Sequence, residues 1–223
     1  MLVRAPASFR LESLSPFGVS YAVACDGSEL AVLVPADGYV YRGEARPEAI
    51  GAATGVRAEP ADVAALLLGL PPLPPMDRSH AWVSSREGAA APAPEAPRIY
   101  LHAPAQERGE TVVVGFARSS SAGGALLPVL FERIGRSGEL LLRARFADYR
   151  PIAGVAMAMT VSVEAPGSRA ILRYREVAVE PEVSPESFSI ATPPGMREAP
   201  LGPPECGPRR RPTAGFSRPW PAC

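Results

Sequence analysis

Few residues of this chain have the types and spacing that catalysis requires. Its two histidines, His80 and His102, lie in or beside strand-like segments, and the pattern around them shows no partner base and nucleophile. Asp148 lies in a predicted turn, where aspartate is favoured for backbone reasons. Acidic residues on alternating segments are expected to face solvent: Glu132, Glu139 and Glu164. No glycine-rich phosphate loop follows a strand, so we predict a protein that is not an enzyme and holds no cofactor.

The three cysteines give no reason to expect a metal site or a structural disulfide. Cys25, Cys206 and Cys223 are scattered at spacings that match no metal motif, and two of them lie in a predicted tail. We therefore predict no metal.

Charge and hydropathy narrow the class of protein further. The 23 basic and 23 acidic residues cancel, so the clustered basic excess of a nucleic-acid-binding protein is absent and we expect no nucleic-acid partner. No run of 18 apolar residues predicts a membrane span, and the first residues do not show the basic-then-apolar pattern that would predict a signal peptide.

The apolar positions carry more information than the polar ones. Met157 and Met159 fall on the same face of one predicted strand. Methionine is unbranched and adapts to irregular apolar partners, which favours ordinary core packing for these two residues and also allows the wall of a cavity for an acyl chain. The sequence leaves both interpretations open for these two residues.

These residues belong to a stretch, Gly138–Phe188, that predicts three antiparallel strands. The segments 140–147, 155–164 and 172–175 alternate between apolar and polar residues, and turn chemistry joins them at 148–154 and 165–168. Alternation points one set of side chains inward: Leu142, Phe146, Met157, Met159, Leu172 and Tyr174.

The N-terminal part mirrors this pattern. Strands are predicted over 8–14, 19–25, 30–34 and 39–42, with Asp26-Gly27 as a hairpin signal. Their inward phase consists of Phe9, Leu11, Tyr21 and Val23. Two short helices are predicted to start near Pro47 and Pro60 and to stop at Gly55 and Gly69. The second helix is expected to act as a lid through Val63, Leu66 and Leu67.

Between the two parts, further strands are predicted over 80–84, 99–102, 111–117 and 126–134. The fold expected is mainly β (α+β): an unclosed antiparallel barrel of about ten strands capped by two or three short helices. It would form one domain over 1–198, with a flexible Ala- and Pro-rich excursion near 85–97. A disordered Pro/Arg-rich tail is predicted over 199–223.

Several short motifs, in this order, resemble the LolA/LolB superfamily of outer-membrane lipoprotein carriers and receptors. The stretch 55–72 has the Gly, Pro, Leu-rich turn and Leu-x-Gly-x-Pro of the helix segment of LolB. LolB-like proteins of high-GC Gram-negative bacteria also share the sequences at 11–18, 35–43, 146–155 and 174–195. The chain departs from the family pattern because the lipoprotein signal, the lipidated cysteine and a first helix and strand are missing. The resemblance therefore predicts an N-terminally incomplete member.

The resemblance implies a hydrophobic cavity that accepts lipoprotein acyl chains for lipoprotein localisation, in the periplasm or on the periplasmic face of the outer membrane. The cavity would be lined by the ten inward residues named above. The implied partners are lipoprotein acyl chains or other lipid, a periplasmic carrier protein and the outer-membrane surface, and the protein is expected to be a monomer. An exposed loop should insert into the membrane, with Pro16-Phe17 and 34–39 as candidates.

Two other functions remain open at this point. A structural envelope protein could use the same fold with a core filled by its own side chains. A lipid hydrolase would need a converging Ser–His pair, which the sequence alone does not reveal.

Overall fold

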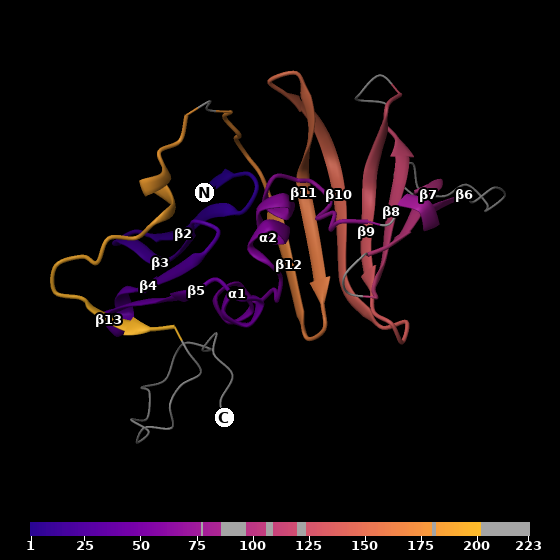
Figure 1. Cartoon of the computed structure of the whole chain (residues 1–223). Helices are drawn as coiled ribbons and strands as arrows, with labels where there is room; N and C mark the ends of the chain where they lie inside the picture. Colours follow the sequence, from indigo (N-terminus) through magenta and orange to yellow (C-terminus); the bar gives the residue numbers. More distant parts are fainter. Residues whose placement is uncertain (77, 86–96, 106–108, 120–123, 180–181, 202–223) are drawn as a thin grey trace. The chain divides into compact units, whose positions relative to one another are not determined.

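The computed structural model describes residues 1–76, 78–85, 97–105, 109–119, 124–179 and 182–201 (Figure 1). By its contacts the chain separates into two compact units, Met1–Ala64 with Glu182–Cys223, and Ala65–Pro181. The single domain over 1–198 stays a prediction beside this division. The described part is mainly β with two short α-helices, as expected, and its strands form two sheets that do not close on themselves.

The first unit contains a six-stranded sheet in the order β1-β2-β3-β4-β5-β13. All its pairings are antiparallel except that of β13 with β5, which is parallel. The elements are β1 (Leu2–Arg4), β2 (Ser8–Ser15), β3 (Gly18–Cys25), β4 (Glu29–Val34), η1 (Pro35–Asp37), β5 (Tyr39–Glu44), α1 (Pro47–Thr54), η3 (Pro185–Phe188) and β13 (Arg197–Pro200).

Both faces of this sheet are covered within its own unit. On one face the Tyr21 hydroxyl donates a 2.8 Å hydrogen bond to the Ala53 carbonyl of α1. On the other face Ile190 packs in a buried cluster with the strand residues Ala22, Ala24, Ala31 and Val40. The sheet is therefore sandwiched between α1 and the chain that follows residue 182.

The second unit contains a seven-stranded antiparallel sheet in the order β12-β11-β10-β9-β8-β7-β6. In Figure 1 the long strands β9, β10 and β11 lie between β12 at the left edge of this sheet and β8, β7 and β6 at its right. The elements are η2 (Arg78–His80), β6 (Trp82–Ser85), β7 (Ile99–Pro104), β8 (Thr111–Arg118), β9 (Leu126–Ile134), β10 (Leu140–Ile152), β11 (Val155–Ala165) and β12 (Ser168–Arg173).

The helix α2 (Pro60–Leu67) contains the division between the units, which falls after Ala64. It ends as predicted at Gly69, which has a left-handed φ of 71°. The chain then continues along the second unit and forms an isolated bridge between Met76 and Ala105. Residues 65–76 therefore connect the last turn of α2 with the chain just after β7, where Ala105 lies.

Three predicted boundaries are wrong. The turn expected over 148–154 is confined to Ala153 and Gly154, because Asp148 takes a local φ of 58° while β10 continues to pair with β11 as far as Ile152. The strand expected over 80–84 starts at Trp82, since His80 belongs to η2.

The third boundary is that of the predicted tail. Ala199 and Pro200 pair with Tyr41 and Arg42 in β13, and the Leu201 amide donates to the Arg42 carbonyl at 2.6 Å. The remainder of the predicted tail, 202–223, lies outside the described residues, as does most of the excursion predicted near 85–97.

Candidate functional site

The ten predicted cavity residues fall into two groups on two different sheets. In the first unit, register places Phe9, Leu11, Tyr21 and Val23 on one face, because Phe9 pairs with Cys25 and Leu11 with Val23. The other six belong to the second unit, on β10, on β11, and on or just after β12: Leu142, Phe146, Met157, Met159, Leu172 and Tyr174.

Burial separates these ten residues into a packed half and a partly exposed half. The side chains at most 3% exposed belong to the core: Phe9, Val23, Leu142, Phe146 and Met159. The partly exposed ones are Leu11, Tyr21, Met157, Leu172 and Tyr174. The helix residues Val63, Leu66 and Leu67 are buried. Only the second half has surface that a ligand can contact.

One of the partly exposed residues, Tyr174, is bonded to the end of α2. The Tyr174 amide donates to the Met159 carbonyl at 2.9 Å, which extends the β11–β12 pairing beyond Arg173. The Tyr174 hydroxyl donates to the Leu67 carbonyl, also at 2.9 Å. This bond satisfies a carbonyl of the last turn of α2 that has no partner within the helix.

A glycine brings the chain after α2 against β11. A Cβ placed on Gly69 would lie 3.1 Å from the Ala158 carbonyl oxygen, and its left-handed φ also favours glycine. The chain neighbours of the two residues in this contact are apolar: Leu70, which follows Gly69, is 49% exposed, and Met157, which precedes Ala158, is half-buried. We call Leu70, Met157, Leu172 and Tyr174 the Met157 surface.

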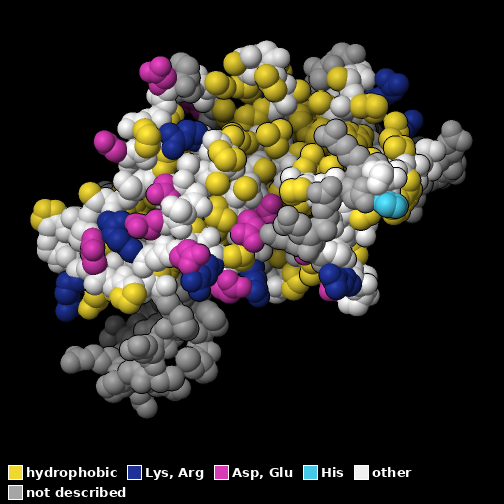
Figure 2. Space-filling model, viewed as in Figure 1, with side chains coloured by type: hydrophobic (Ala, Val, Ile, Leu, Met, Phe, Trp, Pro, Cys, Tyr) yellow, Lys and Arg dark blue, Asp and Glu magenta, His cyan; other side chains and the backbone are white. Residues whose placement is uncertain are grey.

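The ionisable side chain of the Met157 surface, Tyr174, is uncharged, which favours an uncharged ligand. Burial raises the pKa of Tyr174 from 10.0 to about 12, so the phenol is neutral at ordinary pH and stays a hydrogen-bond donor. Figure 2 shows hydrophobic side chains gathered over the seven-stranded sheet, where the surface is hollowed.

Sequence reasoning missed a charged pair on the buried phase of this sheet. Arg133 pairs with Val112 and Leu142 and is 7% exposed. Its Nε lies 3.8 Å from Oε2 of Glu110, whose side chain is 16% exposed. Strand alternation could have predicted the burial of Arg133, because Arg133 points to the same face of its strand as the buried Phe131.

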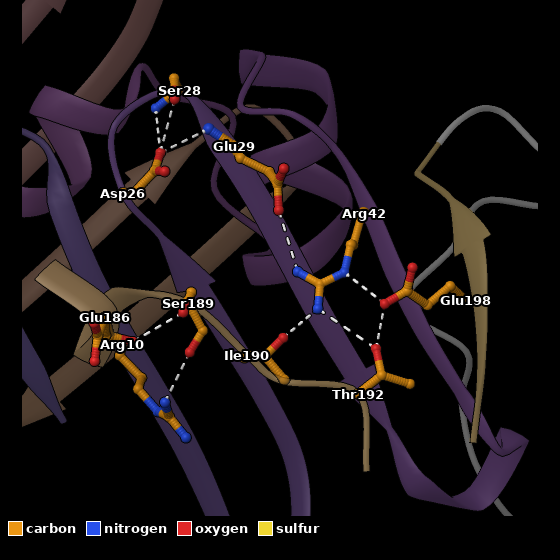
Figure 3. A network of polar contacts seen from close by, with 10 residues as sticks. All are labelled: Arg10, Asp26, Ser28, Glu29, Arg42, Glu186, Ser189, Ile190, Thr192 and Glu198. Carbon is orange, nitrogen blue, oxygen red and sulfur yellow. Dashed lines mark hydrogen bonds and ion pairs between the residues drawn. The ribbon is translucent and has the colours of Figure 1, made fainter. Parts of the chain in front are cut away.

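A second polar cluster holds the C-terminal segment on the first unit (Figure 3). Arg42 of β5 forms ion pairs with Glu29 at 3.2 Å and Glu198 at 3.1 Å, and its Nη2 donates to the Ile190 carbonyl. Arg10 donates to the Ser189 carbonyl at 2.9 Å. These contacts attach a segment far away in sequence to the sheet, which makes the cluster structural.

One arrangement bears on hydrolysis. Ser84 Oγ lies 2.9 Å from His102 Nε2, the reach of a nucleophile and its base. His102 also stacks on Trp82, with ring centroids 5.0 Å apart. Within the described ranges, no carboxylate pairs with His102 to orient its ring, so the third member of a catalytic triad is not identified there.

The hairpin between β2 and β3 carries an exposed aromatic residue at its tip. Phe17 is fully exposed and Leu14 is 73% exposed. In the other candidate loop, 34–39, only Ala36 and Asp37 are exposed. Phe17 is therefore the better placed of the two candidates for contact with an apolar phase.

Comparison with family models, with curated proteins and with solved structures finds no match to this chain. In the described part of the chain, no helix is both long and apolar enough to cross a membrane.

Proposed function

We propose that the protein binds lipoprotein acyl chains on an apolar surface without covalent chemistry and thereby serves lipoprotein localisation. The observation that carries this proposal is the Met157 surface. Its apolar side chains remain partly exposed beside a packed core, although the strand pattern could have buried them. Partly exposed apolar surface that is grouped in one place favours an apolar partner.

The energetics need no catalytic group. Moving an acyl chain out of water is worth about 0.8 kcal/mol for each buried methylene, so a few methylenes on the Met157 surface give measurable affinity. The neutral Tyr174 hydroxyl is already bonded to Leu67, and therefore it adds no unpaired polar group to the surface.

The mainly β character of the chain, with short helices beside its strands, agrees with the fold that the LolB-like resemblance implies. The setting would be the periplasm or the periplasmic face of the outer membrane, with a periplasmic carrier as delivery partner. The exposed Phe17 hairpin is the segment we propose for contact with the membrane.

The alternative is a structural envelope protein with a filled core. It is favoured by the burial of Phe9, Val23 and Phe146, each at most 2% exposed, which leaves no room beside them for a ligand. A hydrolase ranks below both, because the Ser84–His102 pair has no orienting carboxylate among the described residues.

A fluorescent fatty-acyl probe separates the first two functions. The full chain should bind the probe, and a lipidated peptide should displace it while the same peptide without its lipid should not. Met157→Arg should abolish binding, because an unpaired charge on an apolar surface is costly.

Two further variants control for folding and for charge. Leu70→Arg changes an exposed residue of the same surface and should also abolish binding, although it cannot disturb the core. Ser137→Arg adds the same charge at an exposed turn between β9 and β10 and should bind normally. No binding by the folded protein, or equal binding by all variants, would leave the structural function as the better account.

A further inference from the structure

The strands β10, β11 and β12 present a polar face opposite their buried one. On β11, Val161 and Val163 are buried, whereas Thr160 and Ser162, which alternate with them, are only half-buried. Register places Arg145 opposite Ser162, and Ser162 opposite Ile171. Thr160 in turn pairs with Arg173. Because directly paired residues share a face of the sheet, one surface contains Arg145, Thr160, Ser162, Ile171 and Arg173, here called the Arg145 face.

The neighbouring row on the same side of the sheet neutralises its own charges. Arg143 Nε lies 2.7 Å from Glu132 Oε1, and Arg143 Nη1 lies 3.6 Å from Glu164 Oε2. Arg169 Nε lies 3.7 Å from Glu164 Oε1. This row is an alternating ladder across four strands and needs no external ion.

The two arginines of the Arg145 face have no such partner. Arg145 and Arg173 are exposed, and within the described part of the chain neither guanidinium forms an ion pair or a hydrogen bond. The hydroxyls of Thr160 and Ser162 are equally without a side-chain hydrogen bond there. The two arginines are a local excess of positive charge in a chain whose formal net charge is zero.

Spacing allows both arginines to reach the same ligand. They are separated by two strand intervals across the sheet and by two residues along it, which places their Cα atoms roughly 12 Å apart. The hydroxyls of Thr160 and Ser162 lie between them. Two forked cations with two hydroxyl donors between them match the oxygens of a phosphate group.

We propose that the Arg145 face binds the phosphates of an anionic phospholipid bilayer. The exposure of Ile171 favours a bilayer over a soluble phosphate as the ligand. Ile171 is 47% exposed on β12, where it lies between Arg169 and Arg173. An apolar side chain among arginines suits the boundary between headgroups and acyl chains, where arginine stems also pack. The face is part of a sheet, and an extended sheet face fits a bilayer plane better than a small molecule.

This inference does not depend on acyl binding at the Met157 surface. The two surfaces share no residue, and each can fail in its own assay while the other holds.

Sedimentation with lipid vesicles tests the inference on the full chain. Vesicles of phosphatidylglycerol mixed with phosphatidylcholine should bind the protein more tightly than pure phosphatidylcholine, and added salt should weaken the difference. Arg145→Gln with Arg173→Gln should lower the partition coefficient on the anionic vesicles about 30-fold, from the usual contribution of an arginine near such a surface. Binding to the neutral vesicles should not change.

Two double variants make the result specific to this face. Arg145→Lys with Arg173→Lys keeps the charges and should retain most of the binding. Arg46→Gln with Arg57→Gln removes the same number of charges from exposed ion pairs of the first unit and should bind like the unchanged protein.

Three results would overturn the inference. The first is binding to anionic vesicles that is no tighter than to neutral ones. The second is an equal loss in both glutamine pairs, which would mean that only the net charge matters. The third is efficient competition by glycerol phosphate, which would identify a site for a free phosphate compound instead of a bilayer.

Discussion

Replacing Arg42 with alanine should release the C-terminal segment from the six-stranded sheet. The side chain of Arg42 contacts Glu29 on β4, the Ile190 carbonyl and Glu198 on β13 together (Figure 3). Its side chain is 26% exposed, so most of it is shielded from water.

The magnitude follows from the kinds of contact that are lost. The ion pairs with Glu29 and Glu198 are exposed and contribute little. The bond from the guanidinium to the Ile190 carbonyl is charge-assisted and part-buried, which is typically worth about 2 kcal/mol. That free energy should appear as easier opening of the segment that follows residue 182.

Amide hydrogen exchange reads this opening directly. The Arg197 amide bonds to the Gly38 carbonyl at 3.0 Å and the Leu201 amide to the Arg42 carbonyl at 2.6 Å. In Arg42→Ala both should exchange roughly 30-fold faster, whereas amides of β10 and β11 should not change. Arg46→Ala removes a more exposed arginine that bonds only within its own chain neighbourhood, and it should leave both rates as they were. Unchanged exchange in Arg42→Ala, or equal acceleration in both variants, would refute the role we assign to Arg42.

Four further outcomes are expected. Gly69→Val should lower the midpoint of thermal unfolding, because its left-handed φ and the Ala158 carbonyl 3.1 Å from a Cβ both oppose a side chain; an unchanged midpoint would contradict the close contact. The free energy of unfolding should fall between pH 10 and pH 12, because burial raises the pKa of Tyr174, and also those of Tyr21 and Tyr149, so that the folded phenols stay protonated while the unfolded ones ionise. Tyr174→Phe should make that decline shallower, and an unchanged slope would contradict the contribution of Tyr174. Deleting the chain from residue 199 should destabilise the first unit by cutting β13, and a deletion from residue 202 should be milder in the same denaturant titration. A serine-reactive fluorophosphonate should not label the protein, and labelling that Ser84→Ala removes would instead support hydrolase chemistry.

Local periodicity was sufficient to predict most strands and their faces. On β10, Phe146 is 2% exposed beside an exposed Arg145, as the alternation predicted. Side chains on a strand point to opposite faces regardless of what covers them, so this part of the fold can be inferred from sequence.

Residues that favour turns did not predict where β10 ends. Asp148 and Pro151 favour a turn by composition, yet the pairing of β10 with β11 continues past both. Asp148 adopts a left-handed conformation inside the strand, which aspartate tolerates, so the local preference was overridden by pairing with the neighbouring strand.

Contacts between segments far apart in the sequence could not be predicted from local sequence patterns. The pairing of Arg197 with Tyr39 and the bond from Arg42 to Ile190 join residues about 150 positions apart, and no window of sequence contains both partners. The Ser84–His102 pair was missed for the same reason, since two adjacent strands bring these residues together. The division of the predicted cavity residues into a packed and an exposed half depends on packing, which periodicity alone does not specify.

The central claim is that an acyl chain binds at the Met157 surface. It is tested most directly by photo-crosslinking with a lipidated peptide that carries a photoreactive group in its acyl chain, followed by mass-spectrometric mapping of the adducts. We predict adducts on Leu70, Met157 and Leu172, and their loss in the presence of excess lipidated peptide without the photoreactive group. Adducts confined to other residues of the folded protein, or none at all, would contradict the account.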